Sequence, residues 1–197
     1  EISDHARSLL RGAFDTHVHI SPDVVERRID DLTLARRFAE LGLAGFTLKS
    51  HYTSTAERAA VVRAAVPGVH VLGAIALNRA VGGMNPVAVE IAAREGARTV
   101  WFPTDDSVNE SGEETEFPPG AKVPVWMELQ RELRAAGVAI EPVPVVDAAG
   151  DVLPETRAVL RTIARHGLLL ATGHLSRDEI FAVVDAALED GVVDIVV

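Results

Sequence analysis

Two histidines separated by one residue stand near the start of the chain, in residues 14–20 (FDTHVHI). Successive side chains of a β-strand point to opposite faces, so a strand here places Asp15, His17 and His19 on one face. Imidazoles two residues apart can converge on one divalent ion, and a strand end holds them in place. The spacing therefore predicts a metal site with His17 and His19 as ligands.

A single pair of this kind is weak support, because histidines near strand ends are often hydrogen-bonded structural residues. Here two later apolar runs, 45–51 and 168–174, also end in a histidine, His51 and His174. Parallel strands of a barrel present their carboxyl ends at one rim, so three strand ends can deliver imidazoles to one place. We therefore favour metal binding over coincidence, with His51 and His174 as further ligands.

Composition limits the class of protein. The chain has 197 residues, of which 48% are apolar and 24% charged, and this predicts one globular domain spanning 1–197. A formal charge of −10 argues against a nucleic-acid partner, so we expect a small-molecule substrate. No apolar stretch approaches the length of a bilayer span and the N-terminus lacks a signal-peptide core, which predicts a cytoplasmic protein with no membrane partner.

The chain has no cysteine, so a bound metal must be held by nitrogen and oxygen ligands. Zinc is the divalent metal we expect first, with manganese and iron as alternatives.

Apolar runs alternate with helix-like stretches that end in glycine. We expect strands at about 13–20, 45–51, 70–77, 98–103, 138–145, 168–173 and 193–197. The alternation predicts an α/β fold with a parallel sheet. A TIM-like (β/α) barrel is favoured over a doubly wound sheet, because the reactive residues fall at strand ends and no glycine-rich phosphate turn follows the first strand.

Capping signals mark three helix starts. Two are capping boxes that begin at Ser54 and Ser176, and the third is Asn85 followed by a proline. At the other end of the chain, the strand at 193–197 has no helix after it, which leaves an open parallel edge. We expect a C-terminally incomplete barrel that lacks its closing β/α segment, a partly open barrel, or an edge covered in a homo-oligomer.

The sequence resembles the amidohydrolase-like metal-dependent hydrolases. The resemblance is carried by the strand at 15–19, the segment 172–174 (TGH), the β/α repeat and the segments 77–86 and 100–104. The resemblance implies a centre of one or two metal ions that activates water for hydrolysis of a C–N, C–O or P–O bond. It implies that His17 and His19 are ligands. It also implies that His174 binds metal or polarises the substrate.

The chain departs from that family at three strands. The fourth strand has neither a carboxylated lysine nor a glutamate, and Asp105 and Asp106 are the nearest carboxylates. The fifth strand carries Glu141 where the family has a histidine, and the aspartate of an eighth strand is not in this sequence. Lys49, on the face of His51, could be carboxylated, or as a free amine could bind an anionic substrate or a buried carboxylate.

The remaining candidates have two interpretations each. Asp15 either orients an imidazole or bonds to nearby backbone. Asn78, Arg79 and Asp105 follow strands and are candidates for substrate binding, whereas Lys49, His51, His174 and Asp15 are the catalytic candidates. The segment 104–120 is expected to be a lid or a solvated loop. Trp101 and Trp126 are expected in the core and helix layer, with Trp101 alternatively at the edge of the pocket.

Three functions stay open at this point. The first is a metal-dependent hydrolase of a small molecule. The second is a non-catalytic barrel that binds a metal or ligand, which the missing ligands favour. The third is a metal-dependent decarboxylase or other lyase, which would use the same ligands.

Overall fold

A parallel sheet organises the chain. The computed structural model describes residues 3–111, 122–138 and 140–197. These residues form six strands that pair in chain order. The strands are β1 (Phe14–Val18), β2 (Gly45–Leu48), β3 (His70–Ala76), β4 (Ala97–Trp101), β5 (Leu169–Ala171) and β6 (Ile195–Val196). All five pairings are parallel, and the sheet curls into a half-barrel with helices along it, so the predicted α/β class is confirmed.

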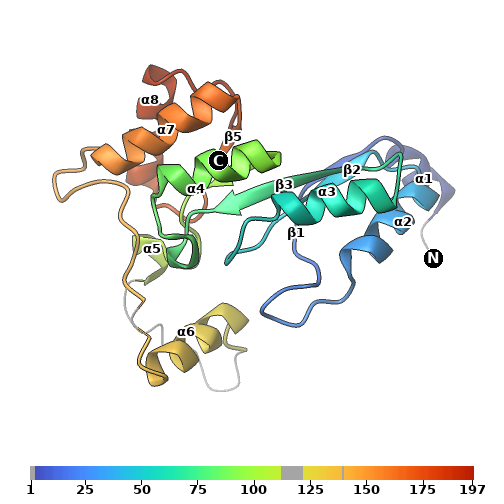
Figure 1. The fold of residues 1–197 in the computed structure, drawn as a ribbon, viewed down its shortest axis with the longest axis horizontal. Coiled ribbons are helices and arrows are strands. Elements are labelled where there is room, and N and C mark those ends of the chain that lie inside the picture. Colours follow the sequence, from blue (N-terminus) through green and yellow to red (C-terminus); the bar gives the residue numbers. More distant parts are fainter. Residues whose placement is uncertain (1–2, 112–121, 139) are drawn as a thin grey trace.

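Helices connect the strands and cover the sheet. The connecting helices are α2 (Asp31–Leu41), α3 (Ala56–Ala65), α4 (Pro86–Glu95), α7 (Pro154–His166) and α8 (Arg177–Glu189), and α1 (Asp4–Leu9) precedes β1. Helices α3, α4 and α7 lie next to one another along one side of the sheet (Figure 1). Three short elements follow β3 and β4: η1 (Arg79–Val81), α5 (Val108–Ser111) and α6 (Val125–Ala135). Figure 1 shows α6 set apart from the helices that cover the sheet.

The helix starts follow the capping signals at two of three positions. Asn85 and Ser176 cap α4 and α8 with their side chains, as predicted. The capping box predicted at Ser54 is wrong, because α3 begins after Thr55. The buried Thr55 hydroxyl does not cap the helix; it accepts from the N–H of Ala74 at 2.8 Å and donates to the carbonyl oxygen of Leu48 at 2.7 Å. Thr55 therefore ties the start of α3 to the end of β2.

The core lies between the sheet and its helices. One cluster of buried apolar side chains joins β3, β4 and β5 to α4, α7 and α8, and it includes Val100, Leu160 and Leu170, all 0% exposed. A second cluster joins β1, β2 and β3 to α2 and α3 around Phe46. Burial of this apolar surface is the main stabilising term of the fold. The packed strands hold their carboxyl ends in fixed positions.

The strand predicted at 138–145 is not formed among the residues that the structure describes, and position 139 lies outside them. Val143 is buried but makes only an isolated bridge, with Ser107. Prolines flank Val143 on both sides and lack the N–H that a strand ladder requires. In the ranges that the structure describes, six of the seven expected strands are therefore formed, and β4 pairs directly with β5.

A closed TIM-like barrel stays a prediction. In the part of the chain that the structure describes, β1 and β6 are the two edges of the sheet. No helix within the described ranges combines the length and the apolar character needed to cross a bilayer.

Candidate functional site

His17, in β1, and His19, just after it, bring their imidazoles together. Nε2 of His17 lies 3.1 Å from Nε2 of His19. Two nitrogens bound to one tetrahedral zinc at the usual bond length are roughly 3.3 Å apart, which is close to this separation. The alternation of side chains in β1 therefore brings the two rings to one point, as the sequence indicates.

Two more imidazoles extend this pair across the ends of three strands. The ring of His51, after β2, stacks on the ring of His19 with centroids 4.6 Å apart and planes 7° apart. His174, after β5, lies with its ring centroid 6.4 Å from that of His51. The structure thus places all four predicted histidines at one rim. As the side chains stand, however, the described residues contain no group of three or more histidine or carboxylate side chains that could hold a metal ion.

Asp15 shares the strand with the histidines but contacts backbone. Its Oδ1 accepts a hydrogen bond from the N–H of His17 at 3.0 Å. This is the second of the two interpretations that the sequence left open for Asp15. The carboxylate therefore bonds to the backbone of His17 rather than to an imidazole ring.

His51 is held by two side chains from the loop after β4. Its Nδ1 lies 2.8 Å from Oγ1 of Thr104 and 3.2 Å from Oδ1 of Asp105. A carboxylate at Nδ1 favours the tautomer that leaves the lone pair of His51 on Nε2, where a metal or substrate can use it. The other oxygen of Asp105, Oδ2, is buried without a hydrogen-bond partner among the described residues.

Asn78 organises this loop through its side-chain amide. Its Nδ2 donates to Oγ1 of Thr104 at 2.7 Å and to the carbonyl oxygen of His51 at 3.0 Å, and its Oδ1 accepts from the N–H of Thr104 at 2.8 Å. Only 1% of Asn78 is exposed. These bonds let Asn78 position His51, and its role in substrate binding stays a prediction.

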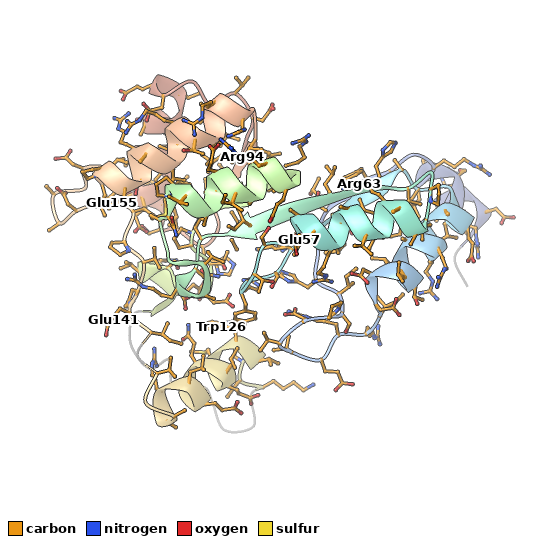
Figure 2. All side chains as sticks on the ribbon, viewed as in Figure 1. Glu57, Arg63, Arg94, Trp126, Glu141 and Glu155 are labelled. Atoms are coloured by element: carbon orange, nitrogen blue, oxygen red, sulfur yellow. The ribbon has the colours of Figure 1, made fainter. Side chains whose placement is uncertain are left out.

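Arg79 is also committed to the protein. Its guanidinium donates to the carbonyl oxygens of Glu141 and Pro142, and its backbone N–H donates to Oδ2 of Asp106 at 2.8 Å. The exposed Glu141 lies at the outer edge of the molecule (Figure 2). The prediction that Glu141 replaces the missing fifth-strand ligand finds no geometric support, since its segment is not a strand of the sheet.

Lys49 sits beneath the histidines against an aromatic ring. Its Nζ lies 3.7 Å from the ring centroid of Trp101, and that ring lies 4.6 Å from the ring of His17. A cation over the face of an indole is attracted by the ring quadrupole. Trp101 therefore borders the site, which is the alternative that the sequence left open, and it links Lys49 to His17.

The loop geometry around His174 depends on the preceding glycine. The N–H of His174 donates to the carbonyl oxygen of Pro103 at 2.9 Å, and its Nδ1 lies 3.5 Å from Oε1 of Glu110. Gly173 has a φ of +67°, and a Cβ there would overlap the backbone oxygens of Phe102 and Pro103. Only glycine allows the β5 loop to approach the β4 loop this closely.

Comparison with protein families covers nearly the whole length of the sequence. Residues 12–197 match the family described as a family of unknown function, DUF6282. The chain belongs to this family. No curated protein matches the chain. The DUF6282 match does not connect the chain to the amidohydrolase-like hydrolases, so that resemblance stays a prediction and the chemistry must be argued from the site.

Burial keeps the imidazoles of this DUF6282 protein neutral. Burial and the nearby charge of Lys49 lower the pKa of His17 and of His19 to about 4, and that of His51 to about 2. Burial also lowers the pKa of His174. Neutral imidazoles keep the lone pairs that metal binding or proton acceptance requires.

The two other ionisable groups of the site shift toward neutral pH. Burial lowers the pKa of Lys49 to about 8, against the attraction of Asp105. Burial and the neighbouring Asp106 raise the pKa of Asp105 to about 7. Groups whose pKa lies near the working pH are suited to proton transfer.

Several residues of the DUF6282 site were missed by sequence reasoning. Thr104 and Gln130 are polar residues without a motif, and Tyr52 follows His51 directly. Trp126, on α6, lines two hollows together with Tyr52, and one of these hollows is also lined by His19 and His51. The segment 104–120, expected to be a lid or a solvated loop, is described only to residue 111, and the described part forms a turn and α5.

Proposed function

We propose that this DUF6282 protein is a metal-dependent hydrolase that cleaves a C–N, C–O or P–O bond of a small molecule. The observation that carries the proposal is the 3.1 Å separation of Nε2 of His17 and Nε2 of His19 at the rim of the half-barrel. Neutral imidazole nitrogens this close either share a proton or bind one cation. The further imidazoles of His51 and His174 on the same rim favour the cation.

The donor set fits a divalent transition metal. Imidazole nitrogen with carboxylate oxygen suits zinc, manganese or iron. His17 and His19 would hold the ion, and the third position falls to His51, His174 or Asp105. Four buried polar atoms of the site have no hydrogen-bond partner in the described ranges: Nδ1 of His19, Nε1 of Trp101, Oδ2 of Asp105 and Nδ1 of His174. When bound, a divalent ion lowers the pKa of water and polarises the group to be cleaved.

The residues around the imidazoles supply the remaining functions. Asp105 is buried, with a pKa near 7, and can accept or release a proton at working pH. As a free amine, Lys49 can supply a cation where negative charge develops on the substrate, whereas a carboxylated Lys49 would supply an anionic oxygen ligand for the metal. Asn78 and Thr104 hold His51 at a fixed angle to the ring of His19. His174 faces the same rim from β5 and can polarise the substrate.

Metal content tests the proposal before any substrate is known. Elemental analysis of the purified protein should find near-stoichiometric zinc, manganese or iron. The double variant His17→Ala/His19→Ala should lose that metal, whereas His5→Ala/His70→Ala, at two exposed histidines, should keep it. Unchanged metal content in the first variant would remove the proposal. Metal-loaded protein is then screened with ester, amide, lactone and phosphoester libraries.

A non-catalytic binding protein is the second candidate. The observation that favours it is that no group of three ligands is assembled in the described part of the chain. Retained metal with no turnover of any library would support this function. Release of carbon dioxide from carboxylic acid substrates, without hydrolysis, would instead support a metal-dependent decarboxylase.

The wider setting of the protein is also proposed. We propose a cytoplasmic protein that acts on a small molecule and forms a homo-oligomer. The edge strand β6 pairs on one side only within the described residues, and such edges are commonly covered by a second subunit. Sedimentation velocity measures the oligomeric state directly.

A further inference from the structure

A cavity of about 310 Å³ lies between α6 and the loops that carry the site. Three side chains of α6, Trp126, Leu129 and Leu133, form one wall, and Val138 and Ile140 extend it. The volume is at the low end of the range for small-molecule pockets. Figure 2 shows Trp126 at the end of α6 nearest to the body of the molecule. The cavity has room for one ring or one short branched chain.

The wall formed by α6 is anchored to the candidate site. Nε2 of Gln130, on α6, donates to the carbonyl oxygen of Asp105 and to Oδ1 of Asp106, both at 3.0 Å. Gln130 is buried, so these bonds are protected from water. The loop that holds His51 through Asp105 is therefore the same loop to which α6 is attached, and the cavity and the imidazoles form one unit.

Four polar side chains that line the cavity are bonded to neighbouring parts of the protein. Asn78, Gln130 and Asp106 all bond to neighbouring loops, and the guanidinium of Arg79 bonds to two backbone carbonyls. Oδ2 of Asp105, which also faces the cavity, is buried and accepts no hydrogen bond from the described residues. A buried acceptor without a partner is unfavourable until a donor reaches it.

Asp105 also faces a second hollow. This hollow, of about 210 Å³, is lined by His19 and His51 as well as Asp105, and it shares Tyr52 and Trp126 with the first. Asp105 thus stands between the apolar cavity and the imidazoles. A molecule whose apolar part fills the cavity would place its polar group at the imidazoles.

We propose that the cavity under α6 binds the apolar part of a small neutral molecule, such as an aryl or branched alkyl amide, whose N–H donates to Oδ2 of Asp105. The apolar wall selects the hydrocarbon part by burial. Asp105 selects a donor, because a carboxylate or phosphate in the same position would face the oxygens of Asp105 and Asp106. Arg79 is the only cation among the described lining residues, and two groups of its guanidinium already donate to backbone carbonyl oxygens.

This inference rests on the proposed function only in calling the bound amide a substrate. Binding is measured without turnover, so the two proposals can fail separately. If the protein holds metal but does not bind the amide, the cavity inference is overturned and the proposed hydrolase is not. Amide binding by a protein without metal overturns the hydrolase alone.

The test uses benzamide, benzoate and acetamide as probes, with binding followed by NMR titration of the full chain. Benzamide and benzoate have the same shape, but benzoate carries an anion in place of the N–H donor. Benzamide should bind at least tenfold more tightly than benzoate and than acetamide, which lacks the apolar part. Equal or tighter binding of benzoate, or no saturable binding of benzamide, overturns the inference.

Two variants localise the binding. Leu133→Trp fills the cavity and should weaken benzamide binding at least tenfold, and Ala80→Phe, on the opposite wall, should do the same if Leu133→Trp does not fold. Leu188→Trp, at a leucine on α8 that is 60% exposed, is the matched control and should bind benzamide like the wild type. Equal binding by the filled variants and the control places the amide elsewhere and overturns the inference.

Discussion

Asn78 and Thr104 hold each other through two hydrogen bonds although they are 26 residues apart in sequence. Nδ2 of Asn78 donates to Oγ1 of Thr104 at 2.7 Å, and Oδ1 of Asn78 accepts from the N–H of Thr104 at 2.8 Å. Oγ1 of Thr104 in turn lies 2.8 Å from Nδ1 of His51. Loops after β2, β3 and β4 therefore meet at one buried amide, and the orientation of His51 depends on it.

The first prediction concerns this amide. Asn78→Ala should lower the free energy of unfolding by about 1–3 kcal/mol, because it leaves buried donors and acceptors of the loops without partners. Urea denaturation measures the change. Asn109→Ala is the matched control at an exposed asparagine, and it should change stability by less than about 0.5 kcal/mol. Equal effects of the two substitutions would contradict the central role of Asn78.

The second prediction compares two glycines with similar backbone angles. Gly167 has a φ of +57°, and a Cβ added there would meet no atom within 4 Å, whereas Gly173, at +67°, faces the backbone of the β4 loop. Gly167→Ala should cost about 1–2 kcal/mol from the left-handed conformation alone. Gly173→Ala should cost roughly 1–3 kcal/mol more from overpacking. Thermal and urea unfolding measure the stability of both variants. Equal losses of stability would show that the close approach at Gly173 is not important.

The third prediction is a pH dependence of stability far from the site. Hydrogen bonds from His166, Arg165 and Arg94 lower the pKa of Glu90 to about 2 from an ordinary value of 4.5. The carboxylate is favoured in the folded state, so its contribution to stability is present above pH 4.5 and is lost as the pH falls toward 2.

Glu90→Gln should therefore be less stable than the wild type at pH 6, and the difference should shrink as the pH falls below 4.5. Urea denaturation between pH 6 and pH 3 measures both proteins. Glu155→Gln, at an exposed glutamate of α7 (Figure 2), is the control and should follow the wild type. A difference between Glu90→Gln and wild type that does not change with pH would contradict the prediction.

The fourth prediction tests the carboxylate behind His51. Because Oδ1 of Asp105 lies 3.2 Å from Nδ1 of His51, Asp105→Asn should weaken metal binding about 10- to 100-fold. Competition with a chelator of known affinity measures the change. Asp151→Asn, at an exposed aspartate, should leave the affinity unchanged. An unchanged affinity in Asp105→Asn would separate Asp105 from the metal centre.

The sequence by itself determined the features that depend on short-range rules. Alternation of side chains along β1 brings His17 and His19 together, and helix caps at Asn85 and Ser176 follow from local hydrogen bonds. The apolar runs predicted a parallel α/β sheet and placed His51 and His174 at strand ends. These features need only neighbouring residues and the general rule that parallel strands end at one rim.

Only the tertiary structure decided which loops meet at that rim. The contacts of Thr104 with Asn78 and His51, and of Gln130 with Asp106, join residues 24 to 53 positions apart, and no local periodicity encodes them. The fifth predicted strand does not form among the described residues, for a related reason. Val143 is buried by packing and makes only an isolated bridge. Its flanking prolines lack the N–H groups that a strand ladder requires. Packing between distant segments decides which loops meet, and this packing forms the cavity beside Asp105.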